Sequence, residues 1–157
     1  MAIALSHGGA TQYASSERSQ EILVGTKEGV AILQQDAAGA WKLAERTLPD
    51  LHISSIIMPP KTDLIFAGAF HGSIHASADG GRTWERRDTG LNQDDVFSMA
   101  WVERDGGVRL YAGTEPAHLF FSDDFGGSWT ELPGIRNVES IPNWSFPAPP
   151  HVAHTKN

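Results

Sequence analysis

The residues best suited to chemistry in this chain of 157 residues are histidines and carboxylates that lie next to short apolar runs. Four of the seven histidines occupy such places, namely His52, His71, His118 and His151. Asp95 and Glu115 occupy similar places. Neutral imidazole together with carboxylate is a common ligand set for divalent metal ions. The same groups transfer protons as general acids and bases. These residue types predict a metal site or a proton-transfer site, provided that the fold gathers them.

An eight-residue motif recurs and indicates how the chain is organised. Ser77–Trp84, with the sequence SADGGRTW, returns as Ser122–Trp129, with the sequence SDDFGGSW, after a shift of 45 residues. An apolar run that ends in Ala-Gly precedes each copy, at 64–68 and at 109–113, with the same shift. Two elements that keep their register indicate a true internal repeat.

A third, weaker copy of the repeat lies earlier in the chain, shifted by 43 residues. Ile22–Gly25 corresponds to the apolar run, and Trp41 corresponds to Trp84. Asp36 keeps the place of the motif aspartate, whereas Gln34, Ala38 and Ala40 replace the serine, the second glycine and the threonine. The chain therefore contains three repeats of 43 to 45 residues.

Within one repeat the sequence predicts four short strands. In the last copy these are 96–102, 108–114, 119–122 and 128–132, separated by turn residues at 105–107 and 124–127. No stretch keeps a 3.6-residue apolar period, so we expect no long helix. Four short strands in a unit of this length are typical of one blade of a β-propeller. The expected fold is therefore all-β.

The motif itself is explained by turn chemistry. An aspartate at a tight turn accepts hydrogen bonds from backbone N–H groups a few residues further on, and Gly81 and Gly126 can take positive φ at little cost. We expect the tryptophan that follows to pack against a neighbouring sheet. The residues with this structural role are Ser77, Asp79, Gly81, Thr83 and Trp84, and in the second copy Ser122, Asp124, Gly126, Ser128 and Trp129.

The pattern Ser-x-Asp-x-Gly-x-Thr-Trp is the Asp-box, also called the bacterial neuraminidase repeat. Ser77–Trp84 matches it at every defined position, and Ser122–Trp129 has Ser128 in place of the threonine. Over residues 20–157 the chain resembles the Asp-box β-propeller superfamily, which includes sialidases, sortilin-type domains and many sialidase-like proteins. The resemblance implies a propeller. It implies no particular activity, because the Asp-box lies at the propeller periphery, away from active sites.

The repeat boundaries predict a partial propeller. We expect blades at 1–49, 50–92 and 93–134, a proline-rich connection at 135–150, and the start of a fourth blade at 151–157. A closed propeller typically has 4 to 8 blades, and three would leave open sheet faces. The chain is therefore expected to be the N-terminal part of a larger propeller. Its expected partner is the remaining blades, or a second chain that completes the ring.

The repeat alignment gathers the chemical residues on one rim of the channel. His52, Asp95 and His151 precede equivalent inner strands. The connections between second and third strands carry Lys27, Glu28, His71, Glu115 and His118. The predicted ligand-binding residues are Lys27, Glu28, His52, His71, Asp95, Glu115, His118, Trp144 and His151. The predicted metal ligands are His52, His71, His118 and His151, with a divalent ion as the candidate cofactor. Trp144 belongs to the segment 141–150, which is either a linker or a rigid pocket wall beside His151.

Composition and motifs narrow the function classes. The net charge of −7 argues against nucleic acid as a partner, and the absence of cysteine excludes thiolate chemistry. No apolar stretch is long enough to predict a membrane span, and no secretory signal is evident, so the cytoplasm is the expected compartment. The Arg-Ile-Pro motif that sialidases typically carry is missing. Two hypotheses remain, a propeller that binds a small-molecule or protein ligand on its rim, and a hydrolase or lyase, similar to glycoside hydrolases, that uses the same rim.

Overall fold

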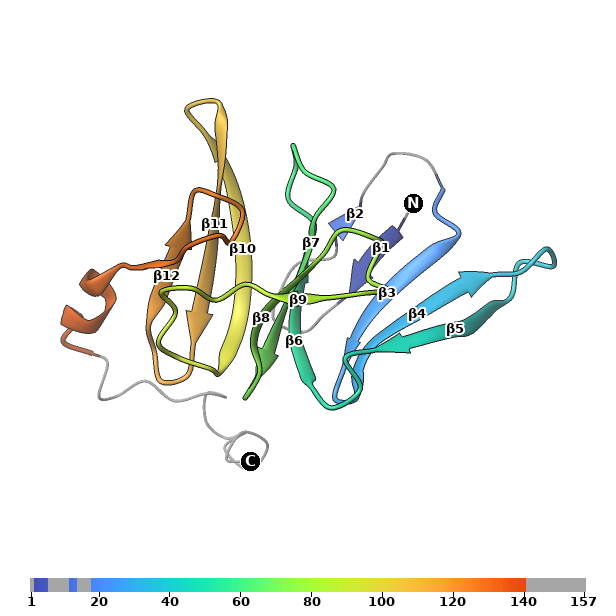
Figure 1. Cartoon of the computed structure of the whole chain (residues 1–157), viewed down its shortest axis with the longest axis horizontal. Helices are drawn as coiled ribbons and strands as arrows, with labels where there is room; N and C mark the ends of the chain where they lie inside the picture. The colour runs from blue at the N-terminus through green and yellow to red at the C-terminus, as the bar shows by residue number, and fades with distance from the viewer. Residues whose placement is uncertain (1, 6–11, 14–17, 141–157) are drawn as a thin grey trace.

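The computed structural model describes residues 2–5, 12–13 and 18–140, which form three β-sheets and one short helix (Figure 1). The first sheet contains β1 (Ala2–Leu5), β2 (Gln12–Tyr13), β3 (Glu21–Thr26), β4 (Gly29–Gln35) and β5 (Trp41–Thr47), in the order β2-β1-β3-β4-β5. The second contains β6 (His52–Ile57), β7 (Ile65–Phe70), β8 (Ser73–Ser77) and β9 (Glu85–Arg86), in chain order. The third contains β10 (Val96–Arg104), β11 (Gly107–Thr114), β12 (Leu119–Ser122) and β13 (Thr130–Glu131), also in chain order, and the 3-10 helix η1 (Pro133–Asn137) follows.

The all-β prediction is confirmed, and the second and third sheets are antiparallel throughout. The predicted strands at 96–102, 108–114 and 119–122 are present with ends that differ by at most two residues. The predicted fourth strand at 128–132 is shorter and covers only Thr130–Glu131. It is shorter because Ser128 still belongs to the Asp124 turn and the backbone N–H of Trp129 donates to the carbonyl of Thr89, in the segment that follows β9.

The first sheet departs from the four-stranded antiparallel pattern that the repeat predicts. It has five strands, and its β1 pairs with β3 in parallel, with Ala2 opposite Glu21 and Leu5 opposite Val24. A parallel pair requires a long crossover connection. Here the strands are separated by residues 6–20, which include β2, and β2 pairs with β1 antiparallel. The repeat had no matching element at this position, so the sequence could not predict the direction of β1.

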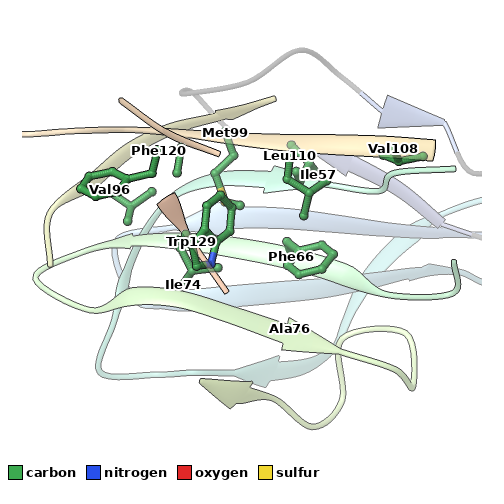
Figure 2. Close-up of a cluster of buried hydrophobic side chains, with 11 residues drawn as sticks. Ile57, Phe66, Ile74, Ala76, Val96, Met99, Val108, Leu110, Phe120 and Trp129 are labelled. Atoms are coloured by element: carbon green, nitrogen blue, oxygen red, sulfur yellow. The ribbon is translucent and has the colours of Figure 1, made fainter. Parts of the chain in front are cut away.

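The three sheets pack against one another through two apolar clusters, with the second sheet in the middle (Figure 1). The first cluster joins the first and second sheets and includes Leu23, Val30, Ile32, Ile53 and Ala67. The second joins the second and third sheets and includes Phe66, Ile74, Leu110, Phe120 and Trp129 (Figure 2). Neighbouring residues of β7 thus face opposite sheets, as strand alternation requires. The middle sheet is therefore buried on both faces.

The aspartate turns form as their sequence predicts. The Asp79 carboxylate accepts hydrogen bonds from the Thr83 hydroxyl (2.6 Å), from the Thr83 backbone (2.8 Å) and from the Ser77 hydroxyl (2.8 Å). Asp124 repeats the pattern with Ser128 and Ser122. Hydrogen bonds from Thr83 and Ser77 hold the pKa of Asp79 below its usual range. Each turn is a local network within its own sheet.

The motif tryptophans connect each sheet to the preceding one, as predicted. The Trp84 indole is half-buried beside the first sheet, and its Nε1 donates to Thr47 Oγ1 of β5 at 2.9 Å. The Trp129 indole is only 4% exposed in the cluster with the second sheet, and its Nε1 donates to the Arg87 carbonyl at 2.9 Å. The tryptophan therefore forms an inter-sheet contact, whereas the aspartate closes a turn.

Candidate functional site

Backbone hydrogen bonds hold several connections together at one end of the sheets, which we call the rim. The β3–β4, β7–β8 and β11–β12 connections and the starts of β6 and β10 all lie along the lower edge of Figure 1. Gly29 N donates to Leu51 O at 2.8 Å, and Ser73 N donates to Asp94 O at 2.9 Å. Each of these bonds joins a turn of one sheet to the segment that enters the next sheet. The rim is thus built from contacts between neighbouring sheets.

His71 and Asp95 form the central pair of the rim. The Asp95 Oδ1 atom accepts hydrogen bonds from the His71 backbone N–H (2.7 Å) and lies 2.6 Å from His71 Nδ1. His71 adopts a positive φ of 55° in the tight β7–β8 turn, which brings both nitrogens to the same oxygen. Because an ionised carboxylate can only accept hydrogen bonds, Nδ1 carries a proton. Nε2 is then the ring nitrogen that is not bound to Asp95. The imidazole is 78% exposed, while Asp95 is 21% exposed. The carboxylate therefore fixes an imidazole that solvent and a ligand can reach.

The Phe70 ring lies against His71, and the His52 ring lies against Phe70. The Phe70 ring lies edge-on to the His71 imidazole, with ring centroids 4.8 Å apart. The centroid of the His52 ring lies 6.1 Å from that of the same Phe70 ring. His52 and Phe70 are paired residues of β6 and β7, which explains why their side chains meet. His52, Phe70 and His71 thus form a continuous row of rings along the rim.

The third sheet contributes Glu115 through its backbone. Glu115 N donates to Asp95 O at 2.9 Å, so the β11–β12 connection is tied to the residue that anchors His71. The structure therefore brings together His52, His71, Asp95 and Glu115, as the repeat alignment predicts.

His118 belongs to a different local group. Its Nδ1 lies 2.8 Å from Glu131 Oε1 in β13, and Arg136 Nε lies 2.8 Å from the same oxygen. The imidazole also stacks on Phe120, with ring centroids 6.2 Å apart. His118 is thus directed to the outer strand of the third sheet, and its partners are distinct from those of His71.

Lys27 and Glu28 occupy the two-residue turn between β3 and β4. Both are exposed, and Glu28 lies 3.9 Å from Arg46 of β5. Arg46 also donates to the Glu28 carbonyl and to Thr26 Oγ1, both at 3.1 Å. This turn is on the rim of the first sheet, with its charged partner on the outer strand.

Trp144 and His151 lie outside the described residues, so the predicted pocket wall beside His151 stays a prediction. Among residues 18–140 no three histidine, aspartate or glutamate side chains gather closely enough to hold a metal ion. The predicted metal site, which includes His151, therefore also stays a prediction. His75, expected to be a packed or edge residue, is half-buried in β8, where burial lowers its pKa although the Gly72 carbonyl at 2.9 Å opposes the shift.

Sequence reasoning missed three neighbours of the site. Arg86 donates to Asp94 Oδ1 at 2.9 Å, next to the Asp95 anchor. Glu131 holds His118, and Phe70 separates His52 from His71. The strand pairing of β8 with β9 and of β12 with β13 would have indicated the first two, because paired strands place Arg86 and Glu131 beside rim segments.

Within the part of the chain that the structure describes, no helix is both long enough and apolar enough to cross a membrane. No family model matches the chain, and no curated protein matches its sequence. The repeat and the geometry of the rim are therefore the features that bear on function.

Proposed function

We propose that this chain is part of an Asp-box β-propeller and that its rim binds a small-molecule ligand at His71 and Asp95. The observation that carries the proposal is the His71–Asp95 pair, which joins two sheets and presents an imidazole that is 78% exposed. The three repeated sheets, the two Asp79-type turns and the inter-sheet tryptophans support the propeller. A polar pair fixed between rigid strands is a typical setting for ligand recognition.

The chemistry around His71 favours a neutral, hydroxyl-rich ligand. With Nδ1–H held by Asp95, the Nε2 of the neutral imidazole accepts one hydrogen bond. Phe70 and His52 offer ring faces and edges next to it, which suit the apolar faces of a sugar ring. Asp95 and Glu115 add carboxylates at the same place, and the neighbouring Arg86 is already paired with Asp88 and Asp94, so an anionic ligand is disfavoured. A neutral saccharide satisfies all three features.

A second candidate function is hydrolysis or elimination at the same rim. An imidazole whose Nδ1–H is held by a carboxylate is oriented to take a proton at Nε2, which is the role of a general base toward water or toward a substrate carbon acid. His71 would be the base and Asp95 the residue that orients it. The observation that favours this candidate is the 2.6 Å separation of Nδ1 and Oδ1 combined with an exposed ring.

A titration by two-dimensional NMR with a panel of neutral mono- and disaccharides tests the binding proposal. We expect one or more sugars to shift the amide signals of residues 70–72 and 95, and His71→Ala and Asp95→Asn to abolish the shifts. His118→Ala is the matched control, because it removes a rim histidine whose partners are Glu131 and Phe120. A control that loses binding as completely as His71→Ala would overturn the assignment to the His71–Asp95 pair.

Chromogenic glycosides of the sugars that bind separate binding from hydrolysis. Release of the chromophore that disappears in His71→Ala and in Asp95→Asn, and that persists in His118→Ala, supports the enzyme. Binding without release supports the non-catalytic propeller. Saccharides that neither bind nor react contradict the ligand class proposed for this rim.

A further inference from the structure

The first sheet carries a tryptophan at the motif position that has no sheet to pack against among the described residues. Trp84 and Trp129 each lie against the preceding sheet, where Trp129 is 4% exposed. Trp41 holds the same place in the first repeat, yet it is 39% exposed. The difference in exposure arises because the first sheet lies at one end of the row of three sheets and has no preceding sheet among the described residues (Figure 1).

The strand register shows that Trp41 belongs to an apolar face. Leu43 pairs with Leu33, Leu33 pairs with Ile22, and Trp41 pairs with Gln35, so these residues share one side of the sheet. Leu23, the neighbour of Ile22, points to the other side and packs on the second sheet. Leu43 is 55% exposed. The outer face of the first sheet therefore carries two exposed apolar side chains, Trp41 and Leu43, on its outer strand.

The far face of the third sheet corresponds, one repeat later, to the face of the second sheet on which Trp129 packs. Trp129 packs with Phe66 and Ile74 of the second sheet, and the residues one repeat further along are Tyr111 and Leu119. Leu110 and Phe120 point into the cluster with the second sheet, so Tyr111 and Leu119 point to the opposite side. Phe121 pairs with Tyr111 on that side, and the Arg109 guanidinium lies 4.1 Å from the centroid of the Phe121 ring. All three aromatic or aliphatic residues are half-buried.

We propose that the open face of the first sheet, with Trp41 and Leu43, packs on the open face of the third sheet of a second copy of this chain, with Tyr111 and Leu119. The argument is continuity, because the chain already forms this kind of interface twice, once with Trp84 and once with Trp129. A head-to-tail contact of this kind closes into a ring when the rotation permits. Two copies with three sheets each give six sheets, which lies within the range of 4 to 8 blades known for propellers.

The association does not require a ligand on the rim. It does use the propeller arrangement of the proposed function. If a monomer binds sugar, the rim proposal stands and only the ring proposal fails. If the chain forms a ring that binds no sugar, the ring proposal stands and only the sugar ligand fails.

Light scattering after size-exclusion chromatography tests the proposal on the 157-residue chain. We expect a mass twice the 17.0 kDa of one chain. Trp41→Glu and Leu43→Glu are each expected to give the single-chain mass, with unchanged far-UV circular dichroism. Glu45→Lys is the matched control, because Glu45 pairs with Ile32, which faces the second sheet, and it is expected to keep the doubled mass. A wild-type chain that stays monomeric at micromolar concentration overturns the proposal and indicates another occupant for the face.

Complementation between two variants tests the head-to-tail geometry. Trp41→Glu disables the face of the first sheet, and Leu119→Glu disables the face of the third sheet, so each variant alone is expected to be monomeric. Mixed together they retain one intact pair of faces and are expected to form a heterodimer. A Leu119→Glu variant that keeps the doubled mass by itself would mean that two first-sheet faces pack on each other, which overturns the ring.

Discussion

Replacement of Trp129 measures how much one inter-sheet contact stabilises the fold. The indole is 4% exposed and belongs to the cluster of the second and third sheets, and its Nε1 also donates to the Arg87 carbonyl at 2.9 Å. Trp129→Ala removes the ring and the hydrogen bond together. Trp129→Phe keeps much of the apolar contact and removes the hydrogen bond.

The magnitude follows from the buried area. A buried tryptophan removes roughly 150–250 Å² from water, which at about 25 cal/mol per Å² is roughly 4–6 kcal/mol. Measured Trp→Ala losses in cores are about 3–5 kcal/mol, because the neighbours relax partly into the cavity. We therefore expect Trp129→Ala to lower the free energy of unfolding by about 3–5 kcal/mol. Trp129→Phe is expected to lower it by about 1–2 kcal/mol, of which the hydrogen bond supplies about 1.

Urea denaturation followed by circular dichroism provides the assay, in a background with Leu43→Glu so that chain association does not add to the stability. Equal slopes of free energy against urea are needed for the variants to be comparable. Val138→Ala, which removes an exposed side chain, is the control and is expected to change stability by less than about 0.5 kcal/mol. A loss below about 1 kcal/mol for Trp129→Ala would refute the view that the motif tryptophan holds neighbouring sheets together.

Two further predictions concern the turns. The pKa values of Asp79 and Asp124 are lowered in the folded chain. For Asp79 the cause is hydrogen bonds from Thr83 and Ser77. For Asp124 burial raises the pKa, but hydrogen bonds from Ser128 and Ser122 together lower it by more. A lowered folded pKa stabilises the fold at any pH above the unfolded pKa of about 3.9. This stabilisation is lost as the pH falls from the unfolded pKa toward the folded pKa. The urea midpoint of the wild type should therefore fall on acidification below about pH 3.9, and the midpoint of Asp79→Asn should fall less. Gly29→Ala should destabilise the chain by at least about 2 kcal/mol more than Gly106→Ala in the same assay, because both have positive φ but a Gly29 Cβ would lie 2.1 Å from the Thr47 carbonyl oxygen, while Gly106 faces open space.

The parts of the fold that the sequence predicted well are those fixed by local chemistry. The Asp79 and Asp124 networks span only a few residues, so the motif contains every donor and acceptor that they need. The strand count and the place of each strand in the second and third sheets follow from the same period. The parallel β1 was not predicted, because its pairing with β3 depends on a connection that has no counterpart in the other repeats.

The candidate site shows the limit of repeat alignment. The alignment identified His71 and Asp95 as rim residues but gave no reason to pair them, since they occupy different positions in consecutive repeats. They meet because the β7–β8 turn hydrogen-bonds to Asp94 of the segment that enters the third sheet. His118 lies at an equivalent connection, yet it turns to Glu131 on its own outer strand. Equivalent positions therefore share a region of the fold without sharing partners.

The two conserved features of the repeat within this chain do separate tasks, and the weakest copy shows this best. Asp36 still accepts the Ala38 and Ala40 amides at 3.0 and 2.9 Å, although the serine, glycine and threonine of the motif are replaced. The aspartate hydrogen bonds to the turn therefore persist when the other motif residues change. The Trp41 side chain that follows this turn is 39% exposed. An exposed indole adds little to the stability of the chain that carries it. Its presence at the motif position is explained when the first sheet, like the second and the third, packs on a preceding sheet.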